Sequence, residues 1–175
     1  RDRCAVQRAV PPMISDSLGA MAGRSALMLD PAAVEPAPWA NGAGTTRELA
    51  AAFGSDGQLL WRVSVADLDR SAPFSSFPGL DRVFIPLDPV RLMVDGVPND
   101  VLPGEELRFQ GEAVAAVVVS RPTRAFNVMT RRGQCCAAVT LRSPGEPLRS
   151  EPTVTVDLGA WVADVIIIST APAPG

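Results

Sequence analysis

The sequence contains no histidine and no tyrosine, and only 5% of its 175 residues are aromatic. Any metal site would have to use carboxylates or the adjacent thiols of Cys135 and Cys136, and no CxxC spacing or facial triad occurs. Without histidine, a serine or cysteine nucleophile lacks its usual general base. We therefore expect no metal and no cofactor, and catalysis is the less favoured interpretation.

Positive charge, long apolar runs and cysteines are also scarce. The net charge of −3 provides no basic field for a phosphate backbone, so we expect no nucleic-acid partner. The longest apolar stretches, AVAAVVVS and WVADVIIIS, are far shorter than the about 20 residues of a membrane-spanning helix, so we expect no membrane partner. Three cysteines, two of them adjacent, form no disulfide framework, which indicates a reducing, cytoplasmic location.

The remaining pattern is that of an all-β protein. Short segments rich in Val, Leu and Phe alternate with Gly, Pro and Asp turns such as GSDG at 54–57, DG at 95–96 and PG at 103–104. Ten short strands in one domain must hide their edges, and a sandwich or a jelly roll of the cupin type does so. The predicted strands cover 45–52, 59–66, 81–87, 90–95, 105–109, 113–119, 124–130, 135–142, 153–158 and 161–168.

Strand alternation sorts the candidate polar residues by face. In LLWRVSVAD, Arg62 and Ser64 lie on the face opposite the apolar residues. In TTRELA, Thr46 and Glu48 alternate with Arg47, so Arg47 and Glu48 cannot enter one cavity from a regular strand unless a bulge intervenes.

Two further stretches supply polar groups and a covering loop. Asn127 offers a donor and an acceptor, and Arg131 a planar fork that suits a carboxylate. The loop that carries Phe74 and Phe77 either folds over an opening or plugs the end of a barrel. Glu48 is the candidate acid or base, and a structural ion pair is an equally good reading of it.

The stretch GAGTTR is not a phosphate loop, because it lacks the lysine of a Walker loop and the spacing of GxGxxG, and the residues after it have a strand-like pattern. By itself, the Asn41–Gly42 pair is typical of a turn, since both residues tolerate positive φ.

Three ordered blocks resemble the HutD/Ves family of small cupin-like proteins. They are PWANGAGTTREL (38–49), WRVSVADLDRSAPFSSFPGLDR (61–82) and FNVMTRRG (126–133), with LPGEELRF in a compatible place between them. The chain differs from the family pattern at Ala43, where glycine is usual, and at Ala125, where aspartate is usual.

The resemblance implies a bicupin with a polar pocket in its first half, a protein of bacterial histidine utilisation that binds or regulates, and a small acidic metabolite as ligand. The ligand-binding residues that it implies are Asn41, Thr45, Thr46, Arg47, Glu48, Arg62, Ser64, Arg82, Asn127 and Arg131. An arginine in such a pocket fits an acidic ligand, because parallel charge-assisted hydrogen bonds fix orientation as well as charge.

We expect three segments along the chain. Residues 1–27 begin with Arg, lack the apolar core of a signal peptide and are predicted to be a poorly ordered extension. Residues 28–133 are predicted to form the first cupin-like half with the pocket, and residues 134–175 a shortened second half. A shortened second sheet would leave an open edge, which favours pairing with another copy as a homodimer.

Overall fold

The computed structural model describes residues 28–170, so the predicted extension over 1–27 lies outside the described residues. These residues form three sheets of antiparallel strands, with one parallel pair, and one short 3-10 turn, η1 (Pro31–Ala33). The central sheet has six strands in the order β2 (Ala37–Pro38), β3 (Gly44–Phe53), β4 (Leu59–Leu68), β11 (Thr123–Arg131), β6 (Leu80–Pro86) and β9 (Leu107–Gln110).

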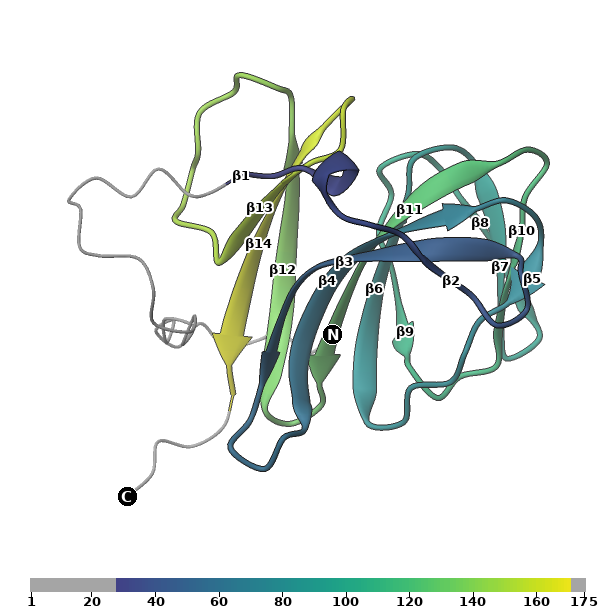
Figure 1. Cartoon of the computed structure of the whole chain (residues 1–175), viewed down its shortest axis with the longest axis horizontal. Coiled ribbons are helices and arrows are strands. Elements are labelled where there is room, and N and C mark those ends of the chain that lie inside the picture. The colour runs from purple at the N-terminus through teal and green to yellow at the C-terminus, as the bar shows by residue number, and fades with distance from the viewer. Residues whose placement is uncertain (1–27, 171–175) are drawn as a thin grey trace.

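Two four-stranded sheets flank the central sheet (Figure 1). The first outer sheet has the order β5 (Ala72–Pro73), β10 (Ala115–Val118), β7 (Val90–Val94) and β8 (Val97–Val101). The second outer sheet has the order β1 (Met28–Leu29), β13 (Val154–Asp157), β14 (Val162–Ser169) and β12 (Cys135–Arg142).

Each face of the central sheet packs on a separate core. Val63 and Val128 belong to the cluster that Val156 and Val165 of the second outer sheet complete. Residues on the other face of the central sheet, such as Phe84, pack against the first outer sheet. Successive side chains of a strand point to opposite faces, so the central strands contribute apolar residues to both cores.

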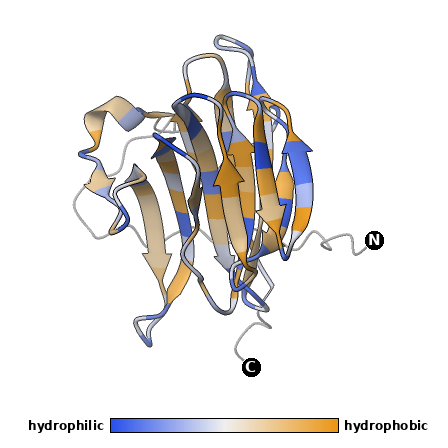
Figure 2. Cartoon of the chain, turned by 90° about the vertical axis from the view of Figure 1, so that its right-hand side faces the viewer, coloured by the Kyte–Doolittle hydropathy of each residue, from blue (hydrophilic) through white to orange (hydrophobic). Residues whose placement is uncertain are grey.

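The central sheet and the first outer sheet together form a jelly roll of the cupin type, as the sequence predicts. Figure 2 shows apolar and polar bands alternating along the strands of this half. Its hairpin between β7 and β8 turns at Asp95 and Gly96, whose φ angles of 48° and 80° are those of a type I′ turn. The DG turn is therefore confirmed.

All ten predicted strands are confirmed, with ends within two residues of the predicted ones. Four strands are missing from the prediction: β1, β2 and β5, of two residues each, and β8, whose sequence VPNDV has low strand propensity. A second cupin-like half over 134–175 stays a prediction; in the structure β12, β13 and β14 join β1 in one sheet. No helix within residues 28–170 is long and apolar enough to cross a membrane.

Candidate functional site

A cavity of about 310 Å³ lies inside the jelly roll, between the central sheet and the loops at residues 39–41 and 73–77. We call it the arginine cavity. Its lining includes Trp39, Asn41, Thr46, Arg62, Ser64, Phe74, Phe77, Arg82, Asn127 and Met129.

Strand register brings the polar residues of the cavity into two rows across the sheet. Met129 of β11 stands opposite Arg62 of β4 on one side and Arg82 of β6 on the other. One pair further along, Asn127 stands opposite Ser64. Two guanidinium groups from strands far apart in the sequence therefore reach one hollow.

Arg82 is the buried cation of the cavity, with 7% of the residue exposed. Its Nε and Nη2 donate to Oδ1 of Asn127 at 3.1 and 2.9 Å, and its guanidinium lies over the rings of Phe74 at 4.3 Å and Phe109 at 5.4 Å. Within residues 28–170 no carboxylate pairs with it. Burial, and then the charge of Arg62, lower the pKa of Arg82 from the ordinary arginine range to about 9.

Arg62 is the second cation of the cavity, and only some of its guanidinium N–H groups have a partner. Its Nη2 lies 3.5 Å from Sδ of Met129, and its Nη1 lies 3.7 Å from Oε2 of Glu48. Its guanidinium lies 5.1 Å from the ring centre of Phe77. Its Nε is buried and has no hydrogen-bond partner among the described residues. A buried donor without a partner is rare in folded proteins.

The rim of the cavity is held by the chain before β3. Trp39 Nε1 donates to Oγ1 of Thr46 at 2.8 Å, and the backbone N–H of Ala43 donates to Oδ1 of Asn41 at 3.0 Å. Gly42 has φ of 64°, which a glycine adopts without strain. This turn presents Trp39 edge-on to Phe74, with ring centres 6.1 Å apart.

Six of the ten sequence-predicted ligand residues line the cavity: Asn41, Thr46, Arg62, Ser64, Arg82 and Asn127. Glu48 reaches the site through its ion pair with Arg62, with 53% of its side chain exposed.

The structure places the other three predicted residues elsewhere. Thr45 and Arg47 lie on the opposite face of β3, where both donate to Oδ2 of Asp67. The bulge in β3 comes only after Glu48, so the alternation of Thr45 to Glu48 is kept. Nε of Arg131 donates to the carbonyl of Leu59 at 3.0 Å, and its side chain does not line the cavity.

Trp39, Phe74, Phe77 and Met129 line the cavity and were not among the predicted ligand residues. Strand alternation could have identified Met129, because it lies on the same face of β11 as Asn127 and opposite to Phe126 and Val128. The phenylalanines were visible only as members of a covering loop.

The groups of the cavity suit an anion and not a metal cation. Two guanidiniums, an amide, hydroxyls and a thioether face the hollow, and no carboxylate from residues 28–170 lines it. Glu48 forms an ion pair with Arg62 at the rim. A divalent cation prefers anionic or imidazole ligands, and two guanidiniums repel it.

A profile described as HutD matches residues 32–165. The chain belongs to the HutD family. It is 39% identical over 98 residues to an uncharacterised 21.2 kDa protein in the hutC 3′ region of Pseudomonas putida. This alignment covers 53% of this chain and 51% of that protein. It is 33% identical over 106 residues to Protein Ves of Citrobacter koseri, covering 58% of this chain and 56% of Ves.

Two solved structures agree with this fold. HutD from Pseudomonas fluorescens SBW25, in a structure described as a formate condition, superposes with a TM-score of 0.61 at 28% identity over 66% of this chain and 65% of that one. The conserved protein of unknown function PA5104 from Pseudomonas aeruginosa PAO1 gives a TM-score of 0.61 at 29% identity, over 68% and 64%. The chain spans about half the length of the curated relatives that it matches.

Proposed function

We propose that this HutD-family chain binds a small carboxylate-bearing metabolite in the arginine cavity, without a metal, and acts as a regulatory binder. The observation that carries the proposal is the state of Arg82. It is a buried guanidinium, and among residues 28–170 its only side-chain hydrogen-bond partner is a neutral amide oxygen.

An unpaired buried cation costs several kcal/mol, because little in the protein interior replaces its hydration. A bound carboxylate would supply the missing charge, and its two oxygens match the geometry of a guanidinium fork. The partnerless Nε of Arg62 offers a further donor to the same guest. The unpaired charge of Arg82 and the unbonded Nε of Arg62 both destabilise the ligand-free protein, and an anionic ligand would offset this destabilisation.

The size and walls of the cavity restrict the ligand to a small acid. A volume of about 310 Å³ lies at the lower end of ligand pockets. Aromatic rings from Trp39, Phe74 and Phe77 suit a flat or apolar body, while Ser64 and Asn127 provide polar contacts. An intermediate of histidine degradation has this chemistry, and the hutC region that names the P. putida relative supports that choice.

The test is a thermal shift of the full chain with a panel of small mono- and dicarboxylic acids, including histidine-pathway acids. A ligand that binds the folded state alone raises the melting temperature by mass action. We expect a shift for at least one acid, and its loss in Arg62→Ala. The control is Arg91→Ala, because Arg91 is exposed on the first outer sheet and pairs with Asp100. No shift with any acid would contradict the proposal.

A second candidate function is catalysis, with Glu48 as acid or base. It is supported by the position of the carboxylate at the rim, 3.7 Å from Arg62. Turnover of a pathway acid, followed by nuclear magnetic resonance and abolished in Glu48→Gln, would favour it over simple binding. A homodimer remains a separate proposal, which light scattering of the full chain tests.

A further inference from the structure

A second hollow, of about 650 Å³, lies on the opposite face of the central sheet, between that sheet and the turn at residues 158–161. We call it the sheet cleft. It receives Thr45, Arg47 and Asp67, which alternate along β3 and β4 with Thr46 and Ala66 of the arginine cavity. Two polar motif residues that the proposed function does not use, Thr45 and Arg47, therefore lie here.

The acidic side of the cleft has unused acceptor capacity. Oδ2 of Asp67 accepts from Thr45 Oγ1 at 2.8 Å and from Arg47, whereas no hydrogen bond from residues 28–170 reaches its Oδ1. The Asp67 side chain is 25% exposed, so this oxygen is only partly hydrated. Asp69 follows two residues later and also lines the cleft, with no ion pair among the described residues.

The basic side of the cleft is Arg124 of β11, which stands opposite Asp67 in the sheet. Its guanidinium makes no hydrogen bond and no ion pair within residues 28–170. The nearby carboxylate of Asp88 is already occupied, since Thr123 and Arg121 donate to it at 2.7 and 2.5 Å. These two hydrogen bonds lower the pKa of Asp88, and the charge of Arg124 adds only a smaller effect.

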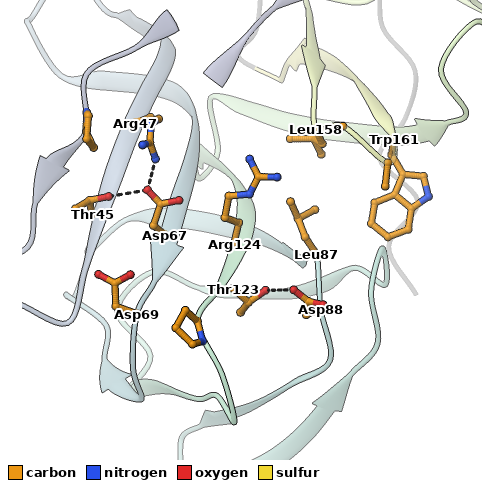
Figure 3. Close-up of a pocket in the computed structure, with 14 residues that line it drawn as sticks. Thr45, Arg47, Asp67, Asp69, Leu87, Asp88, Thr123, Arg124, Leu158 and Trp161 are labelled. Atoms are coloured by element: carbon orange, nitrogen blue, oxygen red, sulfur yellow. Dashed lines mark hydrogen bonds and ion pairs between the residues drawn. The ribbon is translucent and has the colours of Figure 1, made fainter. Parts of the chain in front are cut away.

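An apolar wall completes the cleft. Leu87 and Leu158 come from the core between the two sheets, and Trp161 is half-buried beside them. Figure 3 shows Arg124 between the carboxylates of Asp67 and Asp69 on one side and this wall on the other. The cleft thus presents an unused acceptor, an unused cation and an apolar surface within one space.

We propose that the sheet cleft binds a zwitterionic α-amino acid with a large apolar or aromatic side chain. Its ammonium group would donate to Oδ1 of Asp67 and to Asp69, its carboxylate would accept from Arg124, and its side chain would pack on the partly exposed Leu87 and Trp161. A free amino acid carries an ammonium and a carboxylate on the same carbon, and both are strong hydrogen-bonding groups. This site goes beyond the proposed function and is independent of Arg62 and Arg82.

The test is calorimetric titration of the full chain with L-leucine, L-phenylalanine and L-tryptophan, each beside its N-acetyl and amide derivatives. A lost charge-assisted contact of about 1.5–3 kcal/mol corresponds to at least about tenfold in affinity. We expect each derivative to bind at least about tenfold more weakly than the free amino acid. Arg124→Gln should also weaken binding of the free amino acid at least about tenfold. The control Arg149→Gln removes an exposed charge that does not line the cleft, and it should not weaken binding.

Location is read from the indole N–H resonances in a ¹H–¹⁵N spectrum. The resonance of Trp161, assigned with Trp161→Phe, should shift on binding, and that of Trp39 in the arginine cavity should not. Equal affinity for the N-acetyl derivatives would overturn the proposal in favour of a plain anion site. Absence of binding would overturn it, and so would loss of binding in Arg82→Met, which would place the ligand in the arginine cavity.

Discussion

Replacing Arg82 with methionine should stabilise the ligand-free protein while it removes acid binding. Burial lowers the pKa of Arg82 from the ordinary arginine range to about 9, which corresponds to a cost of about 5 kcal/mol for keeping the guanidinium protonated. Arg82→Met removes that cost but leaves Oδ1 of Asn127 buried without its two donors, which costs about 1–3 kcal/mol. The variant should therefore gain about 2–4 kcal/mol in free energy of unfolding.

The matched control is Arg142→Met, which should have the opposite sign. Arg142 donates to Oδ2 of Asp164 at 2.7 Å, and the side chains are 13% and 9% exposed. Removing one partner of a buried ion pair leaves an uncompensated charge and costs about 3–5 kcal/mol. The two variants make the same chemical change, so the difference between them isolates the missing counter-charge at Arg82.

The assay is urea unfolding of the wild type and both variants at neutral pH, with and without a saturating acid. Acid should stabilise the wild type and Arg142→Met, but not Arg82→Met. Above about pH 9 the unfolded chain binds more protons than the folded one, so the penalty at Arg82 is complete below about pH 9 and declines above it. If Arg82→Met destabilises the empty protein as much as Arg142→Met, the charge is already compensated and the reasoning fails.

Three further predictions concern the rim, the acid stability and the close packing of β3. Glu48→Gln should tighten acid binding, because the Glu48 carboxylate competes with the ligand for Arg62; unchanged or weaker binding in a titration would count against this. Hydrogen bonds from Arg132 lower the pKa of Glu112 from 4.5 to about 2, so stability should decline as the pH falls through this range. In urea unfolding the decline should be shallower in Glu112→Gln. Gly44→Ala should cost about 1–3 kcal/mol, because an added Cβ meets a backbone carbonyl of β4; an unchanged unfolding midpoint would exclude that clash.

Most strands could be predicted from the sequence because each of them carries a local pattern of alternating side chains. A period of two, bounded by Gly, Pro or Asp, is local, and it predicted β3, β4, β6 and β11 together with the faces of Arg62 and Ser64. The same period correctly separated Arg47 from Glu48. The four missed strands are too short or too polar to carry a pattern of this kind.

Register between strands was not predictable, because it depends on pairings between distant segments. The row of Arg62, Met129 and Arg82 requires β11 to align with β4 and β6 at once, and a shift of one residue would turn one arginine outward. Arg131 shows the limit of parity. It shares the parity of Asn127, yet its guanidinium bonds the carbonyl of Leu59 near the end of the sheet and does not reach the cavity.

The motif at the start of β3 faces two hollows because one strand cannot direct neighbouring side chains to the same side. Thr46 and Glu48 point to the arginine cavity, whereas Thr45 and Arg47 point to the sheet cleft. A requirement for both sites would constrain every residue of this segment, although each cavity uses only alternate ones. The density of polar residues that first makes the segment conspicuous thus has a geometric explanation, namely two hollows on the two faces of a single sheet.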